Sequence, residues 1–334
     1  MQLRGRWPVA LPLVAVLAQT AFAEDRPQLS LPIACEPHKT CFIQNYVDVD
    51  PGPGVKDYRC GTATYDRHSG VDFRVLSTAA TKLPVAVLAA ADGTVKGLRD
   101  GVVDVFFKKA NPQDVAGREC GNGVILDHGG GWETQYCHLK QGSVRVAKGQ
   151  TIKRGDRLGD VGFSGMADFA HVHFTVRHDG KIIDPFLPDS VNGACLREDA
   201  GPGLWEPAAA AAFPYKNGEL IAADFAGAPP DVNALEIDHR NSAPLTPMSA
   251  TLLLYGRFLN LLKGDKIHFV ATGPGGQIFD ETAAALNRSK ATDVAFAGKR
   301  RGDQPWPTGS YEGRVELVRE GGVIATGIVT LDLK

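Results

Sequence analysis

A short histidine motif constrains the fold of this chain more than any other stretch. The motif is His171-Val-His173, set within the segment 169–176. Side chains two residues apart on a β-strand point to the same face, and the aromatic and β-branched residues that follow favour a strand. We therefore predict that both imidazoles face one cleft, where neutral imidazole can bind zinc or act as a general base.

Two further motifs supply partners for these histidines. In an extended chain His68, Gly70 and Asp72 share a face, and Gly70 places no side chain between the other two. The run Tyr136-Cys-His138-Leu139 adds a fourth histidine, so four histidines and one aspartate become candidates for one site. Taken singly, each motif is as well explained by a polar strand face or a hydrogen-bonded surface pair.

The ordered combination of these motifs resembles the lysostaphin/LytM-type zinc metallopeptidases, a family of peptidoglycan endopeptidases. The resemblance covers about residues 60–187, little more than a third of the chain. Two departures concern positions that are not ligands: Cys137 replaces a small residue such as alanine, and Phe169-Ala170 replaces a common Gly-Pro. They bear on the fit of the substrate rather than on the metal. The matching segments are 68–72, 136–139, 148–156 and 171–174.

The resemblance implies both a fold and a division of roles within the site. The fold is mainly β, with a LytM-like antiparallel sheet (a duplicated hybrid motif). His68, Asp72 and His173 would bind Zn²⁺, a set of three protein ligands that leaves one position for water. His138 and His171 would be catalytic; the resemblance does not decide which is the general base, and we favour His171. The implied substrates are the stem peptides of peptidoglycan, cleaved at their cross-links.

Two other functions are compatible with the same sequence. One is a non-catalytic LytM-like regulator that activates a separate cell-wall amidase, and the other is a wall-binding module without activity. Such relatives have typically lost zinc ligands, whereas all five positions are filled here. The filled positions favour the enzyme, and the metal content of the purified protein separates it from both alternatives.

The first 23 residues have the pattern of a secretory signal peptide. Arg4 and Arg6 form a basic start, the apolar core 8–17 is too short to span a bilayer, and Ala21-Phe-Ala23 fits a cleavage site. A membrane anchor is the alternative interpretation. Cleavage leaves 34 basic against 38 acidic residues, a net charge of −4. We therefore expect a periplasmic or extracellular protein with no transmembrane segment after cleavage, and no nucleic-acid partner.

Export makes the cysteines candidates for disulfide bonds. The six cysteines allow many pairings, but the runs 124–126 and 134–136 flank a glycine-rich turn and predict a hairpin. This hairpin brings Cys120 opposite Cys137, so we favour that disulfide. Zinc binding by cysteine is disfavoured because no C-x2-C pair occurs. The cysteines are Cys35, Cys41, Cys60, Cys120, Cys137 and Cys195.

Punctuation by glycine and proline predicts the organisation of the mature chain. Residues 24–60 would form a wrapping segment, 61–198 the LytM-like domain, and 205–334 a small β-sandwich that binds an unspecified cell-wall or protein ligand. A valine-rich run at 102–107 predicts a further strand. His128 and His178 lie off the motifs, and we expect surface roles for both.

Overall fold

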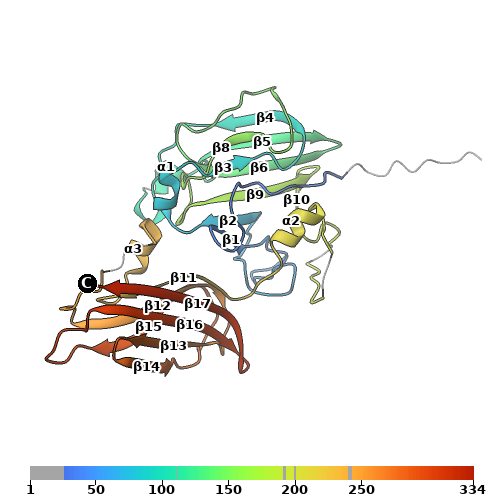
Figure 1. Ribbon diagram of the computed structural model, residues 1–334. Coiled ribbons are helices and arrows are strands. Elements are labelled where there is room, and N and C mark those ends of the chain that lie inside the picture. Colours follow the sequence, from blue (N-terminus) through green and yellow to red (C-terminus); the bar gives the residue numbers. More distant parts are fainter. Residues whose placement is uncertain (1–25, 111, 191–192, 199–200, 240–242) are drawn as a thin grey trace, which may run out of the picture.

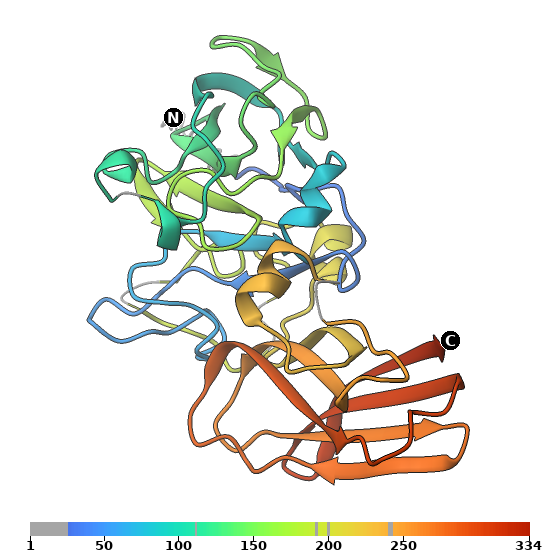
Figure 2. The ribbon, with the colours of Figure 1, turned by 90° about the vertical axis from the view of Figure 1, so that its left-hand side faces the viewer.

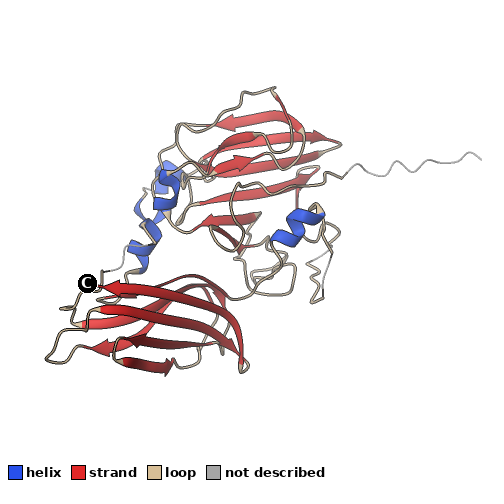
Figure 3. Cartoon of the chain, viewed as in Figure 1, coloured by secondary structure: helices blue, strands red, loops and turns tan. Residues whose placement is uncertain are grey.

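A computed structural model describes residues 26–110, 112–190, 193–198, 201–239 and 243–334. The predicted signal peptide lies outside these residues. Strands dominate the described chain, with a few short helices between them, so the mainly β fold class is confirmed (Figure 3). Figure 1 shows two units: the first is built on one large sheet, and the second contains the strands from β11 onward.

The first unit is centred on an eight-stranded sheet whose paired strands are antiparallel. Along β9, Val172, Phe174 and Val176 point into the hydrophobic core, while the residues between them face the opposite side. The strand order is β1-β2-β9-β6-β5-β4-β7, with β10 also paired to β9, and β3 and β8 form a separate two-stranded sheet. The strands are β1 (Cys41–Asn45), β2 (Val71–Val75), β3 (Ala86–Leu88), β4 (Gly93–Arg99), β5 (Asn122–Gly129), β6 (Trp132–Leu139), β7 (Thr151–Ile152), β8 (Arg157–Asp160), β9 (His171–His178) and β10 (Lys181–Ile183).

The second unit consists of two antiparallel sheets that share one core. Leu254 and Phe258 of β12 pack in the same cluster as Phe269 of β13 and Val315 of β16. The sheet orders are β11-β12-β15 and β14-β13-β16-β17. The strands are β11 (Glu219–Ala226), β12 (Thr251–Leu261), β13 (Lys266–Gly273), β14 (Gly276–Thr282), β15 (Lys290–Arg300), β16 (Gly309–Arg319) and β17 (Gly322–Leu333).

The helices are short. Helix α3 starts at an N-cap, Asp231, whose carboxylate accepts hydrogen bonds from the amides of Asn233 and Ala234. Figures 1 and 2 both place α3 between the two units. None of the helices in the described ranges has the length and apolar character needed to cross a bilayer. The elements are η1 (Thr78–Lys82), η2 (Phe107–Lys109), α1 (Pro112–Val115), α2 (Pro207–Ala212) and α3 (Val232–Ile237).

Part of the predicted wrapping segment belongs to the first sheet. Its residues 41–45 form β1, which pairs with β2. The disulfides Cys35–Cys41 and Cys60–Cys195 lie at the two ends of this region, and Cys120–Cys137 joins the β4–β5 connection to β6. Further along the chain, beyond residue 205, Ala209 of α2 packs in the core of the first unit. The domain limits given above stay a prediction.

The prediction of a strand at 102–107 is wrong. These residues belong to the long connection between β4 and β5, and only Asp104 forms an isolated bridge, with Ser164. The carboxylate of Asp104 accepts hydrogen bonds from the amides of Gln141 and Phe163, at 2.9 and 2.8 Å. The segment is therefore attached through the Asp104 side chain rather than through the backbone hydrogen bonds of a β-ladder. Local β-propensity does not reveal this kind of attachment.

We predict that the disulfides differ strongly in their contribution to stability. Cys60 and Cys195 are 135 residues apart, whereas Cys35 and Cys41 are 6 apart. The entropy of loop closure in the unfolded chain gives about 5 kcal/mol for the long loop and about 2 kcal/mol for the short one. Urea unfolding of C60S/C195S and, as the control, C35S/C41S should show this order. Equal losses would contradict the entropic explanation.

Candidate metal centre

The antiparallel pairing of β2 with β9 creates the centre of the site. In this register Asp72 lies opposite His173, and on the other side of β9 Cys137 of β6 is also a partner of His173. His68 comes from the turn that leads into β2, and His138 lies near the end of β6. The pleat turns His171 and His173 to the same face of β9, away from the core.

Three of these side chains form a compact group. The His173 Nδ1 atom lies 2.8 Å from Asp72 Oδ1, and His68 Nε2 lies 3.1 Å from Asp72 Oδ2. The two ring nitrogens are themselves 3.1 Å apart. His68, Asp72 and His173, which we call the metal group, thus direct two nitrogens and a carboxylate to a space the size of one cation.

The surroundings fix which ring nitrogen of each histidine faces that space. His68 donates its Nδ1 hydrogen to the carbonyl oxygen of Tyr46 at 2.6 Å, so its Nε2 carries the lone pair. On His173 the outer nitrogen, Nε2, lies 3.1 Å from the hydroxyl of Thr175. Two imidazole nitrogens, on rings whose other nitrogen contacts an oxygen, together with one carboxylate, are a donor set that fits zinc.

The other two histidines stand beside the metal group as an imidazole pair. His138 and His171 have ring centroids 4.6 Å apart, and their Nδ1 atoms donate to the carbonyl oxygens of Ser164 (2.8 Å) and Phe169 (2.9 Å). The Nε2 atom of each neutral ring therefore carries a lone pair, and that of His171 lies 3.4 Å from Asp72 Oδ1. Either imidazole can accept a proton from a molecule bound at the metal group.

The backbone at His138 is held in an unusual conformation. Its φ of +63° lies in the left-handed region, which residues other than glycine seldom adopt. The amide of His138 donates to the carbonyl of Cys120, which is disulfide-bonded to Cys137. The disulfide therefore lies directly beside the left-handed backbone that turns the His138 side chain toward the site, as expected from the adjacency of Cys137 and His138 in the sequence.

Burial and mutual interaction shift the pKa values of the five groups. Burial alone would raise the pKa of Asp72, but the adjacent His68 and His171 hold it well below its usual range. Burial lowers the pKa of His171 to about 4, and it lowers those of His138 and His173 as well. Burial by itself would lower the pKa of His68. The adjacent Asp72 carboxylate outweighs this effect, so the pKa of His68 is raised. At neutral pH the site thus holds a carboxylate and at least three neutral imidazoles.

The two histidines that lie off the motifs are apart from this cluster. His128 bonds to the carbonyl of Asp92 and to the hydroxyl of Thr134, while His178 stacks on Trp132 with ring centroids 4.3 Å apart. These contacts are structural. Sequence reasoning did not identify the groups that orient the histidines, namely the Tyr46 and Ser164 carbonyls and the Thr175 hydroxyl, because each acts from a segment whose approach depends on the fold.

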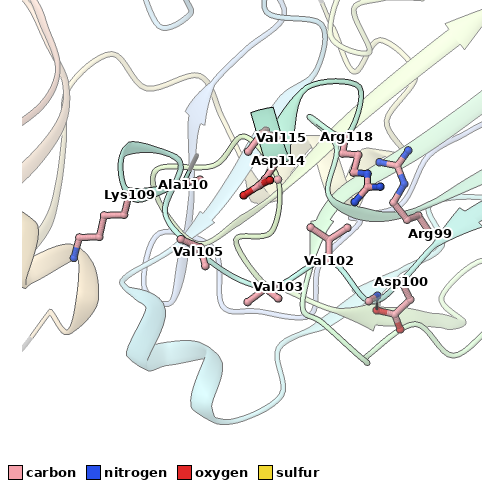
Figure 4. Close-up of a pocket in the computed structure, with 12 residues that line it drawn as sticks. Arg99, Asp100, Val102, Val103, Val105, Lys109, Ala110, Asp114, Val115 and Arg118 are labelled. Carbon is pink, nitrogen blue, oxygen red and sulfur yellow. Dashed lines mark hydrogen bonds between the residues drawn. The ribbon is translucent and has the colours of Figure 1, made fainter. Parts of the chain in front are cut away.

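The cluster opens into a cleft that continues into two neighbouring hollows. The cleft has a volume of about 440 Å³ and is lined by His68 and His173 of the metal group, by His138 and by the Cys120–Cys137 disulfide. It shares Cys120 and Gln135 with a hollow of about 260 Å³, which in turn shares Arg99 with a cavity of about 770 Å³ (Figure 4). The largest of these three hollows is therefore not the site itself but lies further along the same surface.

Comparison with known proteins identifies the segment that carries the site. Residues 66–185 match the model of peptidase family M23. An uncharacterized metalloprotease from Haemophilus influenzae is 33% identical over 134 residues, which are 39% of this chain and 23% of that protein. The peptidoglycan DD-endopeptidase ShyB from Vibrio cholerae is 28% identical over 36% of this chain and 23% of its own length. These alignments thus span about a quarter of each relative.

A solved structure also matches part of this chain. The catalytic domain of the prophage-encoded M23 protein EnpA from Enterococcus faecalis is 19% identical, and the match covers 49% of this chain and 95% of that domain, with a TM-score of 0.30.

We predict that Gly70 is required for the position of the His173 ring. A Cβ atom at Gly70 would lie 2.6 Å from the carbonyl oxygen of Phe174 and 2.7 Å from His173 Nε2. Gly70→Ala should lower the free energy of unfolding by about 1–3 kcal/mol and weaken binding of zinc. Gly97→Ala is the matched control, because a Cβ there meets nothing within 4 Å. Calorimetry of both variants checks this, and equal zinc affinity in the two would contradict it.

Proposed function

Because residues 66–185 are a domain of peptidase family M23, we propose that this chain is a zinc-dependent endopeptidase that hydrolyses peptide cross-links of bacterial peptidoglycan. One observation carries the proposal. The five side chains singled out by the sequence converge in one buried cluster, in which His173 belongs to the metal group and also lies beside the imidazole pair.

The residues present fit a zinc ion, and they define what each would do. His68, Asp72 and His173 would hold the ion, which when bound supplies a Lewis acid for the scissile carbonyl and lowers the pKa of a water. His68 is oriented by the Tyr46 carbonyl, so its Nε2 points to the ion without a change of tautomer. Preorganisation of this kind reduces the cost of binding the metal and the substrate.

We assign the general base to His171. Its Nε2 lone pair faces the cluster, and Asp72 at 3.4 Å would stabilise the imidazolium that forms when His171 takes a proton from the attacking water. The same proton can then pass to the leaving amine. His138, whose Nδ1–H is committed to the Ser164 carbonyl, would accept a hydrogen bond from the water and orient it.

The cavity beyond the cleft supports a substrate with free carboxylates, as peptidoglycan stem peptides have. Arg99 and Arg118 line this cavity (Figure 4). The Nη1 atom of Arg99 donates to the carbonyl of Gly121 at 3.3 Å, and the carboxylate of Asp100 is occupied by the amides of Gly101 and Gly142, each at 2.7 Å. Two guanidinium groups that line one cavity are suited to binding a carboxylate.

The scissile bond is proposed from the relatives. The name of ShyB describes it as a peptidoglycan DD-endopeptidase, and for this chain we propose cleavage of the D-alanyl–diaminopimelyl bond. An exported location in the periplasm is consistent with three disulfides and with a substrate in the cell wall. A cell-wall or protein ligand of the second unit is a further part of the proposal. The regulator of a cell-wall amidase, by contrast, would need neither the metal nor the imidazole pair.

We predict that the purified mature protein binds one zinc ion per chain and cleaves cross-linked muropeptides. Chelation should abolish cleavage, and added zinc should restore it, because the metal group supplies three ligands. Elemental analysis and chromatography of the digestion products measure both. Protein that neither contains nor takes up zinc would falsify the peptidase and favour the regulator.

Two variants on one strand separate ligand from base in the same experiment. His173→Ala should lose both zinc and activity, because it removes a ligand. His171→Ala should keep zinc while hydrolysis falls by about 10²–10⁴-fold, the usual share of general acid–base catalysis. The opposite metal contents would reverse the assignment of the two histidines.

We also predict that Arg99 and Arg118 contribute to binding of the substrate. Replacing both by glutamine should raise KM for muropeptides with free carboxylates by about tenfold, with kcat unchanged, because the contact lies away from the reacting bond. Amidated muropeptides should be far less affected. Arg145→Gln is the control, since Arg145 is exposed and does not line these hollows. An unchanged KM in the double variant would place the substrate elsewhere.

A further inference from the structure

We propose that helix α3 of the second unit positions His171, through a chain of contacts that runs from Glu236 to Arg74 to Phe169. The inference rests on the proposed function only in the role it gives to His171. It makes the second unit a structural part of the site rather than a separate binding module. Glu236, Arg74 and Phe169 would be positioning residues, because none of them belongs to the metal group or the imidazole pair.

The chain of contacts begins with a buried ion pair between the two units. Glu236 on α3 lies 2.8 Å from the Nη2 atom of Arg74 on β2, and its other oxygen is paired with Arg257 of β12. The side chains of Arg74 and Arg257 are almost fully buried, and that of Glu236 is 17% exposed. A carboxylate shared by two buried guanidinium groups has one favourable position, so it fixes both arginines.

The same arginine also contacts a residue next to the site. The guanidinium carbon of Arg74 lies 5.0 Å from the ring centroid of Phe169, a cation–π contact. Phe169 in turn stacks on the His171 imidazole, with centroids 4.2 Å apart and planes inclined by 26°. The Phe169 carbonyl also accepts the Nδ1 hydrogen of His171, at 2.9 Å. One residue therefore sets both the plane and the tautomer of the imidazole.

Further contacts fix the position of the Arg74 side chain. Its Nη1 atom donates to the side-chain oxygen of Gln44, at 2.5 Å, and the pairing of β2 with β9 places Arg74 opposite His171. Removing the Glu236 charge would leave a buried cation with one partner fewer, and such a cation shifts or draws in water. Either response changes the face of Phe169 that His171 stacks on.

The helix itself is attached to the first unit by contacts to its last residues. The hydroxyl of Thr78 donates to the carbonyl of Ile237 at 2.8 Å. Arg257 joins the carbonyls of Leu76, in the first unit, and Leu235, on α3, at 2.6 and 3.2 Å. These bonds hold α3 at the edge of β2, so that Glu236 faces Arg74 without any contribution from the substrate.

The interface offers a matched control for a purely structural role. Glu219 of β11 pairs with His38 of the first unit at 2.5 Å, and its side chain is 9% exposed. This second interdomain carboxylate does not contact Arg74, Phe169 or the site. Loss of either carboxylate weakens the interface, but only loss of Glu236 should disturb His171.

The test compares Glu236→Gln, Phe169→Leu and Glu219→Gln in the full mature chain. In metal-free protein, the ring resonances of His171 in long-range ¹H–¹⁵N spectra should shift in the first two variants and stay unchanged in the third. In zinc-loaded protein, kcat should fall by about 10–100-fold in the first two, with KM and zinc content unchanged, as expected for loss of an outer-shell partner. Phe169→Leu changes only the first unit, so it remains informative if Glu236→Gln folds poorly.

The outcomes separate this inference from the proposed function. If wild-type protein hydrolyses nothing, the proposed function fails, while the spectra of the metal-free protein still decide the positioning of His171. Spectra and kcat in Glu236→Gln that match those of Glu219→Gln would overturn the inference. A shift in Phe169→Leu alone would also overturn the role of α3, because it would confine the effect to the first unit.

Discussion

The antiparallel pairing of β2 with β9 is the constraint on which the site depends. It places Asp72 opposite His173, and a slip of one residue would turn the histidines of β9 into the core and Val172 toward the cleft. The register is held by the apolar residues on the other face of the same strand. The alternation of side chains between the two faces of β9 therefore determines both the core packing and the geometry of the metal group.

Burial makes the cluster chemically distinct from a polar surface. Five ionisable side chains lie together with little exposure, which is unfavourable unless the charges are paired and the rings stay neutral. Asp72 meets the first condition through its histidine neighbours, and carbonyl oxygens such as that of Tyr46 fix the tautomers of the rings. A site of this kind is costly to form and is prepared to bind a cation.

The contact between the two units reaches the site along the face of the sheet that carries the histidines, because Arg74 of β2 pairs with His171 of β9. Arg74 lies on the strand that supplies Asp72, yet its charge is balanced by Glu236, more than 150 residues later in the chain. The ring of Phe169 lies between that charge and His171, with the guanidinium carbon of Arg74 5.0 Å from its centroid and the imidazole centroid 4.2 Å away. The ion pair between the units and the stacking on His171 are thus joined through one side chain.

The sequence by itself determined the mainly β fold class, the strand character of 171–176 and the five candidate residues, because these depend on period-two alternation and on local residue type. It also indicated the hairpin that joins Cys120 to Cys137. Tertiary structure decided that 102–107 is a connection held by Asp104, that β1 joins the sheet, and that Tyr46 and Arg74 support the site. These features arise from contacts between segments far apart in the sequence, where no local pattern records the partner.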